Sequence, residues 1–353
     1  MPTTLMQRRQ FCQGLFALGA IALRGCQAAT AGELTVYLLR KSLPPQLIQR
    51  FQQQWRIPVR LHLEDTPQAL ANLLAAGNLG SAVLSLGDGW LAQAIRRQQI
   101  APIPKGWLPN RLDGADPWRS LLQFLSKGDV LWGLPYRWGA TVLVYRRDFF
   151  ADLGWEPRDW EALWHPAVQG HYSLLSSSRE VIGLTLKSLG LSYNAPPTHP
   201  QLRERLSQLR RGCRFFSSDA YLQPLMLGAT QLAVGWSTDV LPLLKQDPQT
   251  YAAVLPSSGT ALWTDLWVCT QEPDRAALNW LNYWWQPEVA EQLSRFSDAP
   301  SPLVADLTTT LFHRYIPLAT PSAFARSEVL LPLDGASQKR YDNLWQEIFL
   351  SGS

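Results

Sequence analysis

The sequence predicts an α/β protein made of two lobes, and three observations carry this prediction. Strand-like and helix-like segments alternate after residue 31, a pattern typical of a parallel sheet covered by helices on both faces. The chain has 353 residues, more than one hydrophobic core usually serves, and 46% of them are hydrophobic. The run Val130–Arg147 is extended in character but interrupted by Pro135 and Gly139. Such a run suits a segment that leaves one sheet and enters another.

The first 31 residues resemble an export signal and are not expected to belong to the fold. Gln7–Phe11 is a twin-arginine pattern, the apolar stretch after it is too short to span a bilayer permanently, and the first acidic residue is Glu33. Cleavage after Ala31 fits the small residues there, whereas Cys26 lies in a sequence that resembles a lipobox. We therefore predict a periplasmic protein with a twin-arginine-type signal, and lipid attachment at Cys26 stays an open alternative.

Charge and cysteine content narrow the possible functions. Removal of residues 1–31 leaves 29 basic and 28 acidic residues, so the net charge falls from +4 to +1. A nucleic-acid-binding role is not expected, because no basic face remains for a phosphate backbone. Cys213 and Cys269 are the cysteines left. We predict two free buried thiols, because the expected lobes place these residues apart.

The first group of elements follows a strand–helix order. Strands are predicted at 34–39, 58–63 and 81–86, and helices at 45–55, 66–76 and 88–98. Pro44 and Pro45 suit the start of the first helix, and Gly87–Gly89 begins the third. In a parallel sheet of this kind, ligands bind at the carboxyl ends of the strands, where the next helices begin.

A second group follows the crossing segment. Helices are predicted at 160–164, 178–189 with Ser178 as the cap, 201–211, from about 238, at 273–285, 287–296 and 337–350. Strands are predicted at 172–175, 231–236 and 251–255, and a second crossing strand at 262–268. The expected lobes are residues 32–140 with 262–303, and residues 141–261 with 304–353.

An ordered set of motifs resembles the spermidine/putrescine-binding proteins of bacterial ABC importers. The motifs are LPYRWGATVLVY at 134–145, DWEALWHP at 159–166, REV at 179–181, GWS at 235–237, LWTD at 262–265 and WQPEVA at 285–290. The resemblance spans nearly the whole chain after residue 31. It implies a two-lobed periplasmic-binding-protein fold of type II with two crossing hinge strands. It also implies a protein that binds its ligand in the cleft between the lobes and delivers it to an inner-membrane permease. We expect a monomer without cofactor or metal.

The resemblance assigns four ligand residues. Glu180 and Asp265 match carboxylates that pair with ammonium groups, while Trp236 and Trp263 match aromatic residues that flank the methylene chain. Asp265 lies inside an apolar strand, where a carboxylate without a partner is costly to bury, so a functional role is favoured there. Glu180 is equally an ordinary helix-start carboxylate. Either tryptophan could instead belong to the core.

Two further carboxylates, and several positions where this chain differs from the family, affect which ligand is expected. Asp88 and Asp239 stand at helix starts and could contribute to the site, although such residues commonly serve the helix alone. Arg40 and Lys41 stand where the family has an aromatic and hydroxyl-rich turn, and they would repel a cation unless they point away. Because Ser176–Ser178 also lacks one expected carboxylate, a diamine or another organic cation is favoured over a three-amine ligand.

Other functions are alternatives to the binding of an organic cation. An enzyme is not expected, because the five histidines are scattered and no metal, nucleophile-elbow or complete dinucleotide motif occurs. A small anion bound by the Ser176–Ser178 helix start, with Arg40 and Arg179 nearby, is the competing ligand for the same fold. A ligand sensor or scaffold without a transport role is the competing class. A neighbouring gene for a permease favours transport, and one for a sensor kinase favours signalling.

Overall fold

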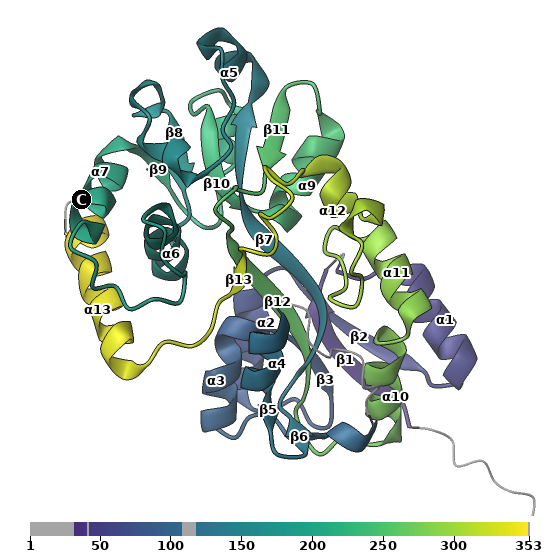
Figure 1. Cartoon of the computed structure of the whole chain (residues 1–353). Coiled ribbons are helices and arrows are strands. Elements are labelled where there is room, and N and C mark those ends of the chain that lie inside the picture. The colour runs from purple at the N-terminus through teal and green to yellow at the C-terminus, as the bar shows by residue number, and fades with distance from the viewer. Residues whose placement is uncertain (1–31, 41, 108–117, 352–353) are drawn as a thin grey trace, which may run out of the picture. The chain divides into compact units, whose positions relative to one another are not determined.

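The structure is a computed structural model that describes residues 32–40, 42–107 and 118–351 (Figure 1). The predicted signal, its Cys26 and the cation Lys41 lie outside the described residues. Within the described ranges, no helix has the combination of length and apolar character that crossing a membrane requires.

Three parallel strands and three helices open the fold, as predicted. The strands β1 (Leu34–Leu39), β2 (Val59–Glu64) and β3 (Val83–Gly87) lie in the order β2-β1-β3. The helices are α1 (Pro45–Trp55), α2 (Pro67–Ala76) and α3 (Asp88–Arg96). Prolines occupy the starts of α1 and α2, and the Thr66 side chain accepts a hydrogen bond from the Ala69 amide. Local start signals therefore placed these elements correctly to within two residues.

The strand β7 (Leu134–Arg146) carries the chain from one group of strands to the other (Figure 1). Residues 134–140 pair with β12 (Ala261–Cys269), whereas residues 141–146 pair with β10 (Leu232–Trp236) and β11 (Tyr251–Val254). The prediction of an extended segment that leaves one set of strands and enters another is confirmed. The sheet is mixed, because β12 runs antiparallel to both β3 and β7.

The sheet runs in the order β2-β1-β3-β12-β7-β10-β8-β9, and β11 and β13 pair with its crossing strands. Its remaining members are β8 (Tyr172–Leu174), β9 (Cys213–Phe216) and β13 (Glu328–Val329). A separate small sheet contains β4 (Ile103–Pro104), β5 (Ser126–Lys127) and β6 (Val130–Leu131). Sequence analysis found neither this small sheet nor β9 and β13, because strands of two to four residues carry little periodicity.

The remaining helices lie in the second part of the chain and around the small sheet. The α-helices are α4 (Trp118–Leu125), α5 (Arg147–Leu153), α6 (Ser178–Ser188), α7 (Leu202–Gly212), α8 (Gln223–Met226), α9 (Ser237–Gln246), α10 (Arg275–Trp284), α11 (Pro287–Phe296), α12 (Leu311–Tyr315) and α13 (Gly335–Trp345). Short 3-10 turns span Lys105–Trp107, Trp160–Trp164, Pro166–Val168 and Leu307–Thr309, and a π-turn spans Gln346–Leu350. The predicted cap Ser178 is wrong by one residue, because the Ser177 side chain accepts the hydrogen bond from the Glu180 amide.

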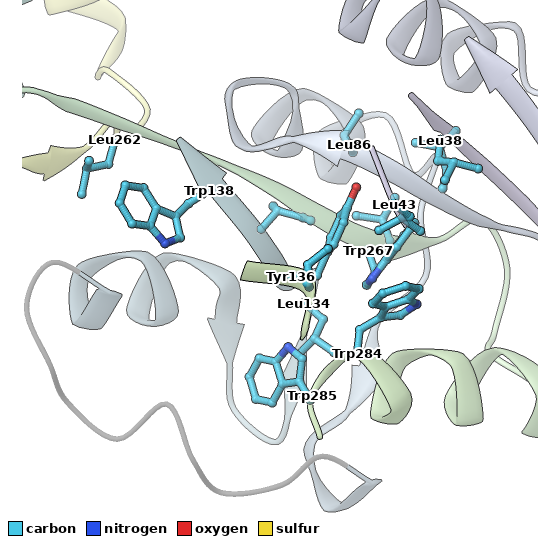
Figure 2. Packing of buried hydrophobic residues seen from close by; sticks show 14 of the residues in the cluster. Leu38, Leu43, Leu86, Leu134, Tyr136, Trp138, Leu262, Trp267, Trp284 and Trp285 are labelled. Carbon is cyan, nitrogen blue, oxygen red and sulfur yellow. The ribbon is translucent and has the colours of Figure 1, made fainter. Parts of the chain in front are cut away.

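The core between the strands and α10 is aromatic (Figure 2). Tyr136 stacks on Trp267 with ring centroids 4.0 Å apart, and Trp267 meets Trp280 edge to face at 5.5 Å. Side chains alternate along a strand, so Tyr136 and Trp138 point to the same side of β7 while Arg137 and Gly139 face the opposite side. Trp138 packs against Trp118, Phe312 and Phe324. The packing of β7 thus decides which of its residues are left for a binding site.

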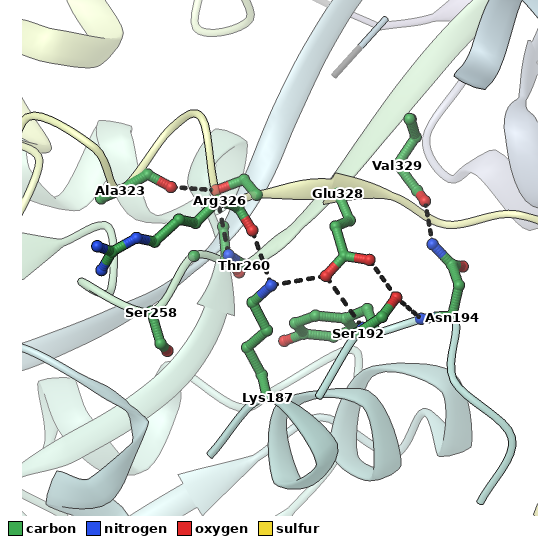
Figure 3. A network of polar contacts seen from close by, with 12 residues as sticks. Lys187, Ser192, Asn194, Ser258, Thr260, Ala323, Arg326, Glu328 and Val329 are labelled. Carbon is green, nitrogen blue, oxygen red and sulfur yellow. Dashed lines mark hydrogen bonds and ion pairs between the residues drawn. The ribbon is translucent and has the colours of Figure 1, made fainter. Parts of the chain in front are cut away.

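A polar network ties the last turn of α6 to β13 (Figure 3). The Lys187 ammonium group donates to the Glu328 carboxylate at 2.6 Å and to the Arg326 carbonyl at 2.7 Å. The Asn194 side chain donates to the Val329 carbonyl, and the Glu328 amide donates to Thr260 at the edge of β12. The C-terminal segment is therefore attached both to α6 and to a crossing strand.

The two described cysteines, Cys213 on β9 and Cys269 on β12, are free, as predicted. The prediction that both are buried is wrong for Cys213, which is half-buried at the short strand β9. Burial raises the pKa of the Cys213 thiol to about 11 and that of the Cys269 thiol to about 12. Both thiols are therefore protonated and unreactive at neutral pH.

Candidate functional site

Three helices that begin at the ends of strands carry an acidic residue in their first turn. Asp88 starts α3 directly after β3, Glu180 lies in the first turn of α6, and Asp239 lies in that of α9 directly after β10. Asp265 comes from the middle of β12. Asp88, Glu180 and Asp265 are buried, with 8%, 4% and 5% of their surfaces exposed. We call these three residues the carboxylate cluster.

One face of the sheet brings the predicted residues together. In the antiparallel register, Asp265 lies opposite Arg137, Trp263 opposite Gly139, and Trp236 opposite Thr141. Opposed residues share a face, and every second residue of β7 points to that face. The sheet therefore aligns Asp265, Trp263 and Trp236 along the stretch of β7 from residue 137 to residue 141.

Asp265 is engaged by a buried cation. The Arg137 guanidinium donates to Oδ2 of Asp265 from Nε at 2.7 Å and from Nη2 at 2.6 Å. Both side chains are less than a tenth exposed. Sequence analysis favoured a ligand-binding role for Asp265 because a carboxylate without a partner is costly to bury, and it missed Arg137 as a partner within the protein. The available signal was a single arginine inside the apolar run of β7, since buried charges are paired.

Glu180 is held by two neutral donors. The Thr141 hydroxyl donates to Oε2 at 2.9 Å, and the Trp236 indole N–H donates to Oε1 at 3.1 Å. Burial raises the pKa of the Glu180 carboxyl, and these two hydrogen bonds oppose that shift. Trp236 therefore orients Glu180 through its N–H while its half-buried ring remains available for packing. Thr141, on the strand that positions Glu180, was not predicted.

Asp88 completes the carboxylate cluster. Its Oδ2 accepts a hydrogen bond from the Thr264 amide at 3.0 Å. Burial, with smaller contributions from the nearby charges of Asp265 and Glu180, raises the pKa of Asp88 to about 8. The Asp88 carboxyl is therefore mainly protonated at neutral pH.

Asp239 lies outside this buried cluster. Its side chain is exposed and accepts a hydrogen bond from the Tyr221 hydroxyl at 2.7 Å. That hydroxyl in turn accepts one from the Trp236 amide, and the two rings meet edge to face at 6.0 Å. Asp239 thus holds Tyr221 against Trp236. Direct contact of Asp239 with a ligand stays a prediction.

Trp263 lies over Gly139. A Cβ atom added at Gly139 would stand 2.0 Å from Cζ2 of the Trp263 ring, so residue 139 must lack a side chain for this packing. The indole N–H of Trp263 is buried and has no hydrogen-bond partner in the part of the chain that the structure describes. Gly139, the glycine that interrupts the apolar run of β7, is therefore the residue against which the half-buried Trp263 ring packs.

Substitution of Gly139 by alanine is expected to displace the Trp263 ring and to lower the free energy of unfolding by about 1–3 kcal/mol, as overpacking does. Gly335→Ala is the matched control, because no atom lies near its added Cβ, and it should change stability by at most about 1 kcal/mol. Urea unfolding followed by circular dichroism measures both. Equal free energies of unfolding for the Gly139 variant and the wild type would contradict this prediction, because they would show that the Trp263 ring can move without loss of stability.

The two arginines of the anion alternative have protein partners. Arg40 is exposed at the surface and pairs with Asp65 at 2.7 Å. Arg179 donates hydrogen bonds to the oxygens of Tyr193, Asn194, Leu331 and Tyr341. Its guanidinium also stands 5.3 Å from the centre of the Tyr341 ring. Both guanidinium groups therefore serve contacts within the protein.

No group of three or more histidine, cysteine or acidic side chains with the spacing of a metal site occurs within residues 32–40, 42–107 and 118–351. Buried carboxylates and half-buried indole rings that lie close together are residue types that commonly line small-molecule sites. The chain belongs to the family of bacterial extracellular solute-binding proteins, and the match covers residues 46–310.

Relatives with known roles agree with this assignment. The spermidine/putrescine-binding periplasmic protein of Escherichia coli is 26% identical over 308 residues, which are 84% of this chain and 86% of the relative. The putrescine/cadaverine-binding protein of Pseudomonas aeruginosa is 26% identical over 355 residues, covering 94% and 98% of the two chains. Both relatives are named as binding proteins for small amines.

Solved structures identify the fold. The spermidine/putrescine ABC transporter substrate-binding protein PotD of Streptococcus pneumoniae matches with a TM-score of 0.72 and 19% identity, over 90% of this chain and 98% of that chain. The predicted two-lobed periplasmic-binding-protein fold is therefore confirmed. The positions of the lobe boundaries and the ligand residues stay predictions.

Proposed function

We propose that this protein is the periplasmic binding component of an ABC importer for polyamines or a related small organic cation. The observation that carries the proposal is that Asp265, Trp263 and Trp236 share one face of the sheet, where Glu180 accepts a hydrogen bond from the Trp236 indole and Asp88 accepts one from the Thr264 amide. A cation that loses its water needs carboxylate oxygens, and indole faces attract cations and pack against methylene groups. The names of the relatives support the same ligand class.

Ligand binding would join two lobes, residues 32–140 with 262–303 and residues 141–261 with 304–353. Asp88, Asp265 and Trp263 would contribute from the first lobe, and Glu180 and Trp236 from the second. Because the ligand contacts both, it stabilises the closed arrangement, which an inner-membrane permease then recognises. Export through a twin-arginine-type signal, with cleavage after Ala31 or lipid attachment at Cys26, and a monomeric state belong to the same proposal.

A small anion is the less favoured ligand. The carboxylates would repel it, and the guanidinium groups of Arg40 and Arg179 are engaged by other protein groups. A ligand sensor without a transport role would use the same site, so its distinction from a transporter depends on the protein partner rather than on the ligand.

The first test is ligand binding by the chain from Gly32 onward. Thermal shift and calorimetry with putrescine, spermidine, choline, amino acids and phosphate are expected to show binding of amines and not of phosphate, because a ligand that binds the native state raises Tm. Substitution of Glu180 by glutamine should weaken amine binding roughly 10–100-fold, the effect of losing a charged hydrogen-bond partner.

The matched control for this test is Glu204→Gln. Glu204 is the third residue of α7, as Glu180 is of α6, but it is exposed. Its replacement should leave amine binding unchanged. Binding of phosphate alone, or no response to any amine at millimolar concentration, would overturn the proposed cation site.

A further inference from the structure

Sequence analysis assigned Asp265 to a ligand ammonium group, but its carboxylate is already paired with a positively charged side chain of the protein. Two nitrogen atoms of Arg137 donate to the same oxygen of Asp265, and Arg137 is only 6% exposed. The pair is built into the sheet, because β7 and β12 place the two residues directly opposite each other. An arginine remains protonated in proteins, so this positive charge is permanent.

Few charged groups of the carboxylate cluster are left to pair with a ligand. The Arg137–Asp265 pair contributes no net charge. Asp88 accepts a hydrogen bond from a backbone amide, and at neutral pH its carboxyl is mainly protonated because its pKa is about 8. Glu180 is left as the member of the carboxylate cluster whose side-chain partners, Thr141 and Trp236, are both neutral. Within the carboxylate cluster, Glu180 is therefore the carboxyl group that is paired neither with a guanidinium nor with a backbone amide of the described residues.

We propose that Arg137 is a specificity-determining residue whose guanidinium takes the place of a second ligand ammonium group, so that the site selects organic cations with a single positive charge. The inference rests on the proposed function, because it concerns the same site. The ammonium group of the ligand pairs with Glu180, and its uncharged part extends along Trp263 toward the Arg137–Asp265 pair. A second ammonium group at that end would meet the Arg137 guanidinium and be repelled in a site of low dielectric constant.

Two amines of equal size test this selection. Putrescine is a dication, and pentylamine replaces one of its two ammonium groups by a methyl group. Calorimetry at pH 7 with the chain from Gly32 is expected to show at least tenfold tighter binding of pentylamine than of putrescine. In Arg137→Met, Asp265 is free to accept an ammonium group, so the ratio of the two affinities should shift at least tenfold toward putrescine.

Two further variants keep the test informative. The double variant Arg137→Met/Asp265→Asn has no charge at the pair, so it no longer repels a second ammonium group and its preference for pentylamine should be smaller than that of the wild type. This variant keeps the test open even if the single variant fails to fold. Arg203→Met removes an exposed arginine that pairs with Glu347 on the surface, and it should leave both affinities unchanged.

The outcomes separate this inference from the proposed function. Tighter binding of putrescine by the wild type, with the same ratio of affinities in the double variant, would overturn the role of Arg137 and leave the cation site intact. Failure of the folded wild type to bind either amine or choline would overturn both.

Discussion

Replacement of Arg137 by methionine is expected to lower the free energy of unfolding by about 3–5 kcal/mol. The substitution leaves the Asp265 carboxylate buried without the guanidinium that neutralises it. A buried charge without a partner costs far more than an exposed one. Guanidinium chloride is unsuitable for this measurement because it screens charges, so urea unfolding at pH 7 is the assay.

A double-mutant cycle isolates the pair. Arg137→Met/Asp265→Asn removes both charges and should recover most of the loss, because an uncharged pair leaves no isolated ion in the interior. Arg203→Met is the control for loss of an arginine. It should lower the free energy of unfolding by less than about 1 kcal/mol, because its partner Glu347 is exposed. Additive effects of the two single substitutions would contradict a coupled buried ion pair.

Substitution of Asp88 by asparagine is expected to stabilise the protein, and the gain should increase with pH. The folded-state pKa of about 8 lies above the ordinary value of 3.8, chiefly because of burial. Between these two values the unfolded chain holds fewer protons at Asp88 than the folded chain, so wild-type stability decreases as pH rises. Asparagine removes this dependence and can keep the hydrogen bond from the Thr264 amide.

The gain from Asp88→Asn should be close to zero near pH 4 and reach at most about 5 kcal/mol at pH 8, above which it levels off. Urea unfolding of both proteins between pH 4.5 and pH 9 measures it. Glu288→Gln is the matched control, because Glu288 is an exposed acidic residue in the first turn of α11. A gain that is the same at pH 4.5 and pH 8 would show that Asp88 is ionised throughout this range.

The local signals of the chain were sufficient for most of the regular structure. The helix that starts at Pro45 and the strand Leu34–Leu39 lie where periodicity and proline position indicated. The crossing strand β7 was recognisable because a long apolar run with a proline and a glycine fits neither a helix nor an ordinary strand. Short elements such as β9 and β13 were missed, since their pairing depends on distant residues.

The candidate site was only partly predictable. Asp265, Glu180 and Trp236 were chosen by family resemblance, and the structure shows them on or beside one sheet face. Thr141 and Tyr221, which hold Glu180 and Trp236, were not chosen, because a hydroxyl group in a strand or loop carries no sign of its partner. Asp239 matched a helix-start pattern as well as Asp88 did, yet it is exposed and Asp88 is buried.

The sequence by itself determined the alternation of strands and helices, the crossing segments and the family, because these depend on periodicity, turn residues and the order of motifs along the chain. Only the tertiary structure decided the charge of the site. Arg137 and Asp265 are 128 residues apart in sequence, and their contact exists because the register of β7 against β12 places them opposite each other. Burial then raises the pKa of Asp88 and makes the Arg137–Asp265 pair costly to break, because a carboxylate loses water only when its environment folds around it.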